Sequence, residues 1–351
     1  MKKQKKMKKQ KKILWSILAL MPLAFMFTGC NKDTDNGTII GEYPKYNWMG
    51  RISDTKMLSE LSIPGTHDSG TEKIGPGPAH TQNFSIAQQL NDGIRFLDIR
   101  LKKEDDKLQL YHGHGLFSYD CKVDFDCVLN WCKDFLEKNP TEVILMSIKN
   151  EEPNEDITKY LNGFYFENNE WKNLFWRGNS SDPQGNCKNG LPTMGEVRGK
   201  IVVFKRFKYV TSVPYFIDWY TEWDGADRGS ETFKIKLQSG FCYYIEDEFK
   251  EHNTPKKLNK VKEHMNSAHS GNAKDVYLTF NSIAYNEANG RTPYWYAWGN
   301  ADPKMNKGLS EFLDENSGKH RWGIVVLDFY NNEEDAIDNS IVSSLIQSNF
   351  D

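Results

Sequence analysis

The sequence predicts an α/β protein built as a single domain around one irregular, or distorted, (β/α)8 TIM barrel. Eight short runs of apolar or alternating residues follow one another after residue 57, each with the length of a strand. Segments of helical composition lie in several gaps between them, and strands that alternate with helices form parallel sheets. The gap between the second and third runs has only six residues, too few for a helix, so the barrel is expected to be irregular.

The expected strands are runs in which apolar residues are continuous or alternate with polar ones. In chain order they are Leu58–Ile63, Ile94–Leu101, Leu108–His112, Val143–Lys149, Lys200–Arg206, Cys242–Asp247, Val276–Asn281 and Gly323–Asp328. Three of the gaps have helical composition, at Ser85–Asn91, Asp124–Lys138 and Ser310–Asn316. No repeat or low-complexity block interrupts this part of the chain.

Ionisable side chains stand at the ends of seven of the eight expected strands. Side chains two residues apart in a strand share a face. On several of these strands the shared face is apolar up to its last side chain, which is polar. In a barrel the carboxyl ends of the strands meet at one mouth, where catalysis takes place. A single charged strand end often just meets water, but seven of them, two with histidine, favour an active site. The residues are His67, Asp68, Asp98, Arg100, His112, Lys149, Arg206, Asp247 and Asp328.

These residue types suit phosphoryl transfer. Two histidines can act as general base and general acid near neutral pH, and a carboxylate beside a histidine fixes its tautomer. The planar fork of an arginine binds phosphate oxygens and stabilises the charge that develops on them. Arg100 stands where a metal-dependent phosphodiesterase would need an acidic ligand, and no CxxC or HExxH spacing is present. We therefore expect neither a metal nor another cofactor.

Five segments, in order along the chain, resemble motifs of the bacterial phosphatidylinositol-specific phospholipase C (PI-PLC X-domain-like) family. They are Leu61–Thr71 (LSIPGTHDSGT), Gly93–Arg100, Tyr111–Gly113, Asn139–Lys149 and Arg198–Arg206. The resemblance extends from about Trp48 to the C-terminus. It implies a distorted barrel that cleaves phosphatidylinositol to diacylglycerol and inositol 1,2-cyclic phosphate.

The resemblance also implies roles for the two histidines. His67 would be the general base on the inositol 2-hydroxyl, and Asp328 would orient it. His112 would be the general acid that protonates the diacylglycerol oxygen, with Asp68 assisting. Because the attacking oxygen already belongs to the substrate, little orientation entropy remains to be lost.

The remaining residues would bind the substrate, again by resemblance. Arg100 would hold the phosphate, with Asp98 positioning the groups around it. Phe249 stands where we expect a tyrosine of the family, so it keeps a ring to stack on inositol but lacks the hydroxyl. The inositol hydroxyls would be bound by Lys149, Arg206 and Asp247.

Three alternatives remain open at this point. His114, two residues after His112, would share its face if the strand continued, and could be the acid instead. A different barrel phosphodiesterase, glycerophosphodiesterase-like or sphingomyelinase D-like, would need a metal and acidic ligands. A non-catalytic lipoprotein could bind inositol headgroups.

The N-terminus has the pattern of a lipoprotein signal peptide, residues 1–29. A lysine-rich start precedes an apolar run, and the run ends in FTGC, which resembles a bacterial lipobox. We expect lipidation of Cys30, a flexible tether over residues 30–44 and the catalytic domain over residues 45–351. The protein would then be a secreted lipoprotein anchored to a membrane, on its periplasmic face or at the cell surface. An uncleaved membrane anchor is the alternative.

Charge argues against nucleic acid as a partner. The net charge is −3, and it becomes −11 without residues 1–29, whose eight lysines have no acid to balance them. The expected partners are phosphatidylinositol or glycosylphosphatidylinositol lipids at a membrane surface, with the protein as a monomer. Besides Cys30 the chain has five cysteines, an odd number that cannot all pair, and a Cys121–Cys127 bridge is possible.

Overall fold

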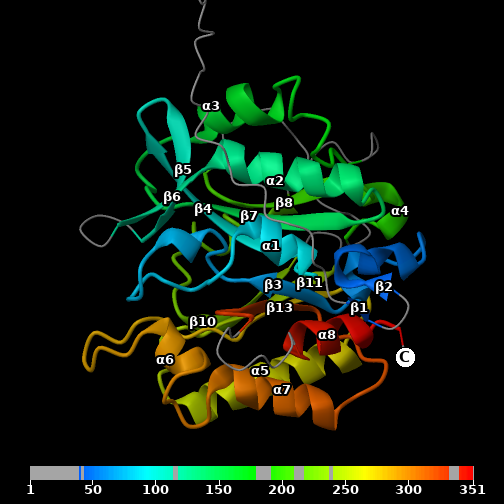
Figure 1. Cartoon of the computed structure of the whole chain (residues 1–351), viewed down its shortest axis with the longest axis vertical. Coiled ribbons are helices and arrows are strands. Elements are labelled where there is room, and N and C mark those ends of the chain that lie inside the picture. The colour runs from blue at the N-terminus through cyan, green and yellow to red at the C-terminus, as the bar shows by residue number, and fades with distance from the viewer. Residues whose placement is uncertain are drawn as a thin grey trace, which may run out of the picture. The chain divides into compact units, whose positions relative to one another are not determined.

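A curled sheet of eleven strands forms the centre of the described part of the chain (Figure 1). The computed structural model describes residues 39–40, 43–113, 118–178, 191–208, 217–236, 240–331 and 340–350. The predicted signal sequence, Cys30 and His114 lie outside these ranges.

Parallel pairing dominates the sheet. The strands from β11 to β9 run parallel in the order β11-β12-β13-β3-β4-β7-β8-β9, and β10 adds an antiparallel edge to β11. Within the described ranges no pairing joins the edge strands β9 and β10, so the barrel is open on that side. The predicted distorted barrel is therefore confirmed. The strands are β1 (Ile39–Ile40), β2 (Tyr43–Pro44), β3 (Ile63–Thr66), β4 (Phe96–Glu104), β5 (Lys107–His112), β6 (Tyr119–Asp124), β7 (Val143–Asn150), β8 (Lys200–Arg206), β9 (Ile217–Asp218), β10 (Glu231–Lys236), β11 (Cys242–Asp247), β12 (Val276–Phe280) and β13 (Ile324–Leu327).

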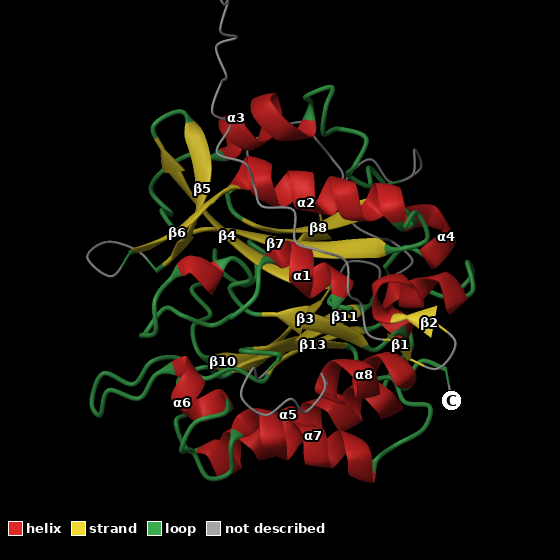
Figure 2. Cartoon of the chain, viewed as in Figure 1, coloured by secondary structure: helices red, strands yellow, loops and turns green. Residues whose placement is uncertain are grey.

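Helices cover the sheet from outside, with α5, α7 and α8 along one side and α1 and α2 along another (Figure 2). Helix α7 packs against both α5 and α8. The α-helices are α1 (Ile86–Asn91), α2 (Phe125–Lys138), α3 (Thr158–Tyr160), α4 (Met194–Val197), α5 (Thr254–Ser270), α6 (Pro293–Ala297), α7 (Met305–Glu315) and α8 (Ser340–Gln347). Short 3-10 segments are η1 (Lys45–Arg51), η2 (Leu58–Glu60) and η3 (Thr71–Lys73), and η5 (Leu161–Phe166) is a π-helix.

The first two predicted helices begin at side-chain caps. The Ser85 hydroxyl accepts a hydrogen bond from the Gln88 backbone N–H (3.3 Å) at the start of α1. The Asp124 carboxylate does the same for the Cys127 N–H (2.9 Å) at the start of α2. Each cap satisfies one of the backbone donors that a helix leaves unpaired at its N-terminus. The third predicted helix is α7, which begins five residues before Ser310.

The prediction of a strand over Leu58–Ile63 was wrong. Leu58 and Leu61 are buried, but Leu58 begins the 3-10 segment η2, and residues three apart share a face in that geometry. The strand starts only at Ile63 and continues through Pro64 and Gly65. A Cβ on Gly65 would come within 2.8 Å of the Phe96 Cβ, so close packing of β3 on β4 requires glycine there.

The prediction that Leu108–His112 is a barrel strand was also wrong in its topology. This segment, β5, pairs antiparallel with β4, with Leu101 opposite Leu110, and then with β6. Only two residues separate β4 from β5, a length that permits a hairpin and no parallel crossover. The carboxyl half of β4 therefore extends beyond the barrel as an antiparallel sheet with β5 and β6, and His112 reaches the mouth from the end of β5.

The cysteines do not form the Cys121–Cys127 bridge. Cys121 is a buried free thiol, whereas Cys127 is disulfide-bonded. Cys132 and Cys242 are also free. None of the helices in the described ranges has both the length and the apolar character of a membrane span.

Candidate active site

The parallel pairing of β3 with β13 brings His67 and Asp328 together. Thr66 and Leu327 are partners in register at the ends of these strands, so the residues that follow them emerge side by side. The His67 backbone N–H donates to the Leu327 carbonyl (3.0 Å), and His67 Nδ1 lies 2.8 Å from Asp328 Oδ1. Because a carboxylate only accepts, Nδ1 carries the proton and Nε2 is left as the basic nitrogen.

Asp68 connects both histidines to the arginine. Its backbone adopts a left-handed conformation (φ 44°), which turns the side chain back into the mouth. One carboxylate oxygen lies 3.0 Å from Arg100 Nε, and the other accepts a hydrogen bond from His112 Nδ1. That second oxygen is also 3.7 Å from His67 Nε2. A single buried carboxylate therefore contacts both histidines and Arg100.

Arg100 lies among three buried carboxylates. Its guanidinium nitrogens are 3.0 Å from Asp68, 3.0 Å from Asp98 and 3.5 Å from Glu151. Burial alone would lower the pKa of Arg100, but the carboxylates raise it well above its usual value. Burial raises the pKa of Asp68 and Asp98, and Arg100 together with the other basic groups nearby more than reverses this, so both pKa values are lowered. Asp68, Asp98 and Arg100 are thus ionised throughout the neutral range.

The histidine–carboxylate pair on β3 and β13 has its own electrostatics. Burial and the Arg100 charge lower the pKa of His67, but the carboxylates of Asp328 and Asp68 together outweigh them, so the net pKa is raised. Burial also raises the pKa of Asp328, against the opposing effect of His67. A proton on His67 is therefore held more firmly than on a free imidazole, as a residue that takes up a proton during a reaction requires.

A row of basic residues extends across three strands from Arg100. Arg100, Lys149 and Arg206 are register partners on β4, β7 and β8, so their side chains leave the same face at the same level. Lys149 Nζ lies 3.3 Å from Glu151, and Arg206 Nη1 lies 3.8 Å from Asp98. The row lines the mouth next to the two histidines.

Arg206 is held in place by two residues that the sequence analysis did not single out as site residues. Asp224 accepts hydrogen bonds from Arg206 Nε and Nη2 (2.9 and 3.0 Å), and the Trp223 ring lies 3.6 Å from the guanidinium carbon. A bidentate carboxylate and a stacked ring fix the orientation of a guanidinium. Both residues follow β9, and no motif in the sequence pointed to them.

Glu151 was missed too, although alternation could have found it. It follows Lys149 by two residues and is buried between Lys149 and Arg100. Among the described residues, two buried carboxylate oxygens of the mouth accept no hydrogen bond: Asp98 Oδ1 and Asp328 Oδ2. Buried acceptors without donors are costly, and the hydroxyl groups of a ligand would satisfy these two oxygens.

Asp247 and Phe249 lie at and just beyond the end of β11. Burial raises the pKa of Asp247 to about 6, against the opposing charges of Arg206 and Lys257. The Phe249 ring is partly exposed, and Lys250 Nζ lies 5.5 Å from its centre. In the described ranges no group of three or more histidine, cysteine, aspartate or glutamate side chains is arranged to hold a metal ion.

Replacing Asp247 by asparagine should stabilise the protein. A carboxyl whose native pKa is raised from 3.8 to about 6 weakens folding once it ionises, so its penalty grows between pH 4 and 6 and stays above that range. We expect the variant to gain on the order of 2 kcal/mol at pH 8 and nothing at pH 4. Urea unfolding of Asp247→Asn at both pH values checks this, with Asp314→Asn on the surface of α7 as the matched control. An equal gain at the two pH values would contradict it.

Comparison with known proteins supports the same family as the motifs. The PI-PLC X family model (PI-PLC X 1) matches residues 54–228. The 1-phosphatidylinositol phosphodiesterase of Staphylococcus aureus (strain Newman) is 30% identical over 318 residues, covering 86% of this chain and 94% of that protein. The chain belongs to the phosphatidylinositol-specific phospholipase C family. The Listeria monocytogenes 1-phosphatidylinositol phosphodiesterase is 31% identical over 291 residues, 80% of either chain.

Solved structures of this phospholipase C family have the same architecture. A variant of the phosphatidylinositol-specific phospholipase C from Staphylococcus aureus superposes with a TM-score of 0.74 at 28% identity, covering 87% of this chain and 96% of that one. The Listeria monocytogenes phosphatidylinositol-specific phospholipase C shares the fold, with a TM-score of 0.63 at 24% identity and coverage of 87% and 98%.

Of the ten residues predicted for the site of this phospholipase C family member, eight lie at the carboxyl ends of strands or just beyond them, and Asp98 and Arg100 lie within β4. Direct contacts join His67, Asp68, Asp98, Arg100, His112, Arg206 and Asp328 into one network. Lys149 joins that network through Glu151. Gln82 lies behind this network and holds its backbone in place. Its side-chain amide donates to the backbone carbonyl oxygens of His67 (2.9 Å) and Leu327 (2.8 Å).

Proposed function

We propose that this protein is a phosphatidylinositol-specific phospholipase C, a phosphatidylinositol diacylglycerol-lyase. The observation that carries the proposal is the arrangement of two histidines, each bonded through Nδ1 to a different carboxylate, beside one buried arginine. Both Nε2 atoms are then available for proton transfer, and the arginine is placed for a phosphate between them.

In the first half of the step, His67 Nε2 takes the proton of the inositol 2-hydroxyl. The oxygen of that hydroxyl attacks phosphorus and closes the cyclic phosphate. Asp328 stabilises the imidazolium that forms on His67, because its oxygen accepts the Nδ1–H throughout. The nucleophile is part of the substrate, so no external hydroxyl must be captured.

In the second half, the bond between phosphorus and the glycerol oxygen breaks. His112 Nε2–H gives its proton to that oxygen, and diacylglycerol leaves. Asp68 accepts the His112 Nδ1–H and keeps the charged ring in position. Arg100 offers guanidinium N–H groups to the phosphoryl oxygens, and Asp98 and Glu151 orient the guanidinium.

The inositol ring would lie over the basic row. Lys149 and Arg206 donate hydrogen bonds to hydroxyl oxygens, while Asp247 and Asp98 Oδ1 accept from hydroxyl hydrogens. Phe249 supplies a ring against the apolar face of the sugar. The names of the relatives, which specify phosphatidylinositol, support the same headgroup. Free phosphatidylinositol and glycosylphosphatidylinositol share this headgroup, and both are proposed as substrates.

Phosphorus NMR of the full chain with phosphatidylinositol in mixed detergent micelles and excess EDTA tests the proposal. We expect the signal of inositol 1,2-cyclic phosphate to appear first, with inositol 1-phosphate following more slowly. Activity that needs added calcium would instead indicate a metal-dependent phosphodiesterase. If headgroup binding were retained but no product formed with or without metal, the protein would be a non-catalytic inositol-binding lipoprotein.

We also propose that lipidated Cys30 anchors the enzyme to a membrane. The support comes from the lysine-rich start, the apolar run and the FTGC sequence. Cys30→Ser should abolish incorporation of labelled fatty acid, and with it cleavage after residue 29. Gel mobility and radiolabelling of the expressed protein measure both effects, with Cys242→Ser as the matched control. Cleavage and labelling that persist in Cys30→Ser would contradict the assignment.

A further inference from the structure

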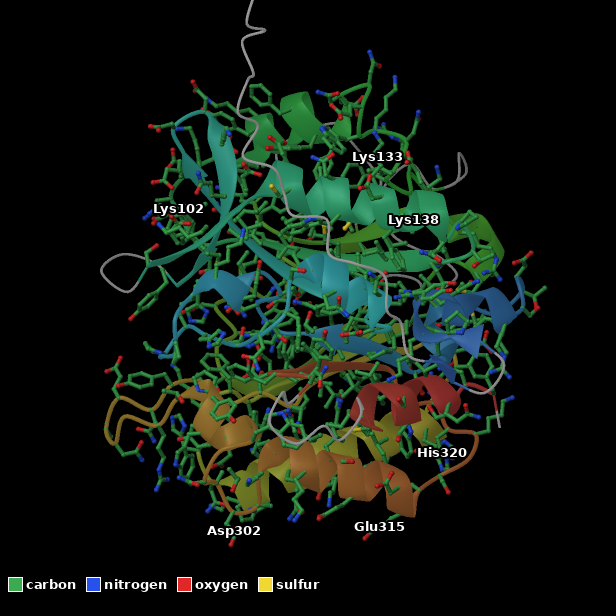
Figure 3. All side chains as sticks on the ribbon, in the orientation of Figure 1. Lys102, Lys133, Lys138, Asp302, Glu315 and His320 are labelled. Carbon is green, nitrogen blue, oxygen red and sulfur yellow. The ribbon has the colours of Figure 1, made fainter. Side chains whose placement is uncertain are left out.

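A basic pocket of about 510 Å³ lies at the end of the barrel opposite to the active site. Its walls come from the segments that lead into the amino ends of β3, β12 and β13 and from the C-terminal segment. Figure 3 shows His320, which lines this pocket, on the other side of the molecule from Lys102 in the carboxyl half of β4. β3 has four residues, so the two sites are separated by at least about 13 Å of strand.

The pocket collects positive charge in an acidic protein. Its basic and titratable lining residues are Arg51, Lys56, His269, Lys319, His320 and Arg321. Glu60 is the one acidic residue in the lining, and it is engaged by Lys56 Nζ (2.9 Å) and by the Met57 backbone N–H (2.9 Å). Clustering of like charges costs energy unless an anion offsets it.

Arg321 is fixed in the pocket wall by the backbone. Its Nη1 donates to the carbonyl oxygens of Asn272 (2.9 Å), Ser59 (3.3 Å) and Asp275 (3.3 Å). Its Nη2 is buried and donates to no acceptor within the described residues. The guanidinium carbon lies 5.4 Å from the centre of the Tyr277 ring, so Arg321 is a fixed positive charge in the pocket wall, which attracts an oxyanion.

Two histidines complete the wall next to Arg321. The rings of His269 and His320 are 4.5 Å apart, and His320 stacks on Trp322 at 4.6 Å. His320 Nδ1 lies 3.1 Å from the Gly318 carbonyl oxygen, so Nδ1 carries the proton and Nε2 is left for a ligand. Burial lowers the pKa of His269, and the neighbouring His320 and Arg321 lower it further, an effect that a bound anion would reverse.

We propose that this pocket binds a phosphate group, either free in solution or as the headgroup of an anionic lipid. The fixed Arg321 charge and the exposed Lys319 attract a tetrahedral oxyanion. His320 Nε2 accepts from the O–H of a hydrogen phosphate, and His269 becomes a donor once the bound anion favours its protonated form. Its volume admits a phosphate with a substituent attached. The proposal is independent of the proposed function, because none of these residues belongs to the catalytic network.

Histidine NMR of the full chain in detergent micelles tests the proposal directly. With carbon-labelled histidine, addition of inorganic phosphate at constant ionic strength should move the ring signals of His269 and His320 along a saturating curve. The signals are assigned by the variants His269→Gln and His320→Gln. The signals of His67 and His112 report phosphate at the active site separately.

The decisive variant is Lys319→Glu, which reverses an exposed charge that makes no ion pair in the described part of the chain. It should weaken phosphate binding at this pocket by at least about tenfold, whereas Lys256→Glu on the surface of α5 should leave it unchanged. Equal affinity in the two variants, or shifts that fail to saturate, would overturn the proposal.

Lipid nanodiscs distinguish the two sources of phosphate. The full chain is placed in discs of phosphatidylcholine alone or with phosphatidate, whose headgroup is a phosphate monoester. Shifts of His269 and His320 that require phosphatidate would assign the pocket to a lipid headgroup. Shifts with free phosphate alone would assign it to a soluble ligand, and shifts with neither would reject the site.

Discussion

His67→Ala and His112→Ala should each lower kcat on phosphatidylinositol by a factor of about 10² to 10⁴, the range that general acid–base groups contribute. His67 loses the nitrogen that receives the 2-hydroxyl proton, and His112 loses the proton for the leaving oxygen. Both side chains reach the surface of the mouth, with 14% and 23% of their side chains exposed, so neither variant should unfold the barrel. Phosphorus NMR rates and thermal unfolding curves of the same samples measure the two effects.

A substrate with a better leaving group separates the two histidines. An inositol phosphodiester that releases 4-nitrophenolate needs no proton on its leaving oxygen, so it bypasses a general acid. On this substrate His112→Ala should recover most of its lost rate, while His67→Ala should stay impaired because attack still requires a base. Recovery of His67→Ala, or of both variants alike, would reverse or refute the assignment.

Arg100→Lys should lower kcat by a factor of about 10² to 10³ while the fold is kept. Lysine retains the charge that Asp68, Asp98 and Glu151 need, so the carboxylates remain neutralised. A lysine ammonium group cannot contact all three carboxylates and still present a planar pair of N–H groups to phosphate. Steady-state kinetics should show the loss mainly in kcat, because the interaction strengthens as charge develops on phosphorus.

The control for Arg100→Lys is the same substitution at Arg177, a partly exposed arginine paired with Glu167 outside the site. Arg177→Lys should leave both kcat and the unfolding temperature near those of the unchanged protein. If Arg100→Lys retained a rate within about threefold of the unchanged protein, the guanidinium would not be the group that stabilises the transition state.

The active-site network was largely predictable because it depends on strand alternation. Asp98 and Arg100 share a face by their spacing alone, and the register of parallel strands then aligns Lys149 and Arg206 with them. The same alternation places Glu151, two residues after Lys149, on that face as well. The contact of His67 with Asp328 was predicted from the family resemblance, and strand alternation alone could not give it, because it requires β13 to pair with β3 across the whole length of the chain.

The errors have equally local causes. An alternating run such as Leu108–His112 has the same pattern in a parallel and in an antiparallel strand, so only the length of its connection could reveal the hairpin. β3 was placed too early because Pro64 and Gly65 are poor strand residues, while the apolar Leu58 and Leu61 before them belong to a 3-10 turn. Asp224 and Trp223 reach Arg206 from a loop, where no periodicity guides a prediction.

The left-handed backbone of Asp68 limits how this enzyme can evolve. Most residues pay about 1–2 kcal/mol in that conformation, whereas asparagine and aspartate tolerate it. Asparagine would keep the bend but remove the charge shared by Arg100 and His112. Glutamate would keep the charge but lengthen the arm and strain the turn. The residue at this position must therefore satisfy two separate requirements, one conformational and one electrostatic, and aspartate is the side chain that satisfies both.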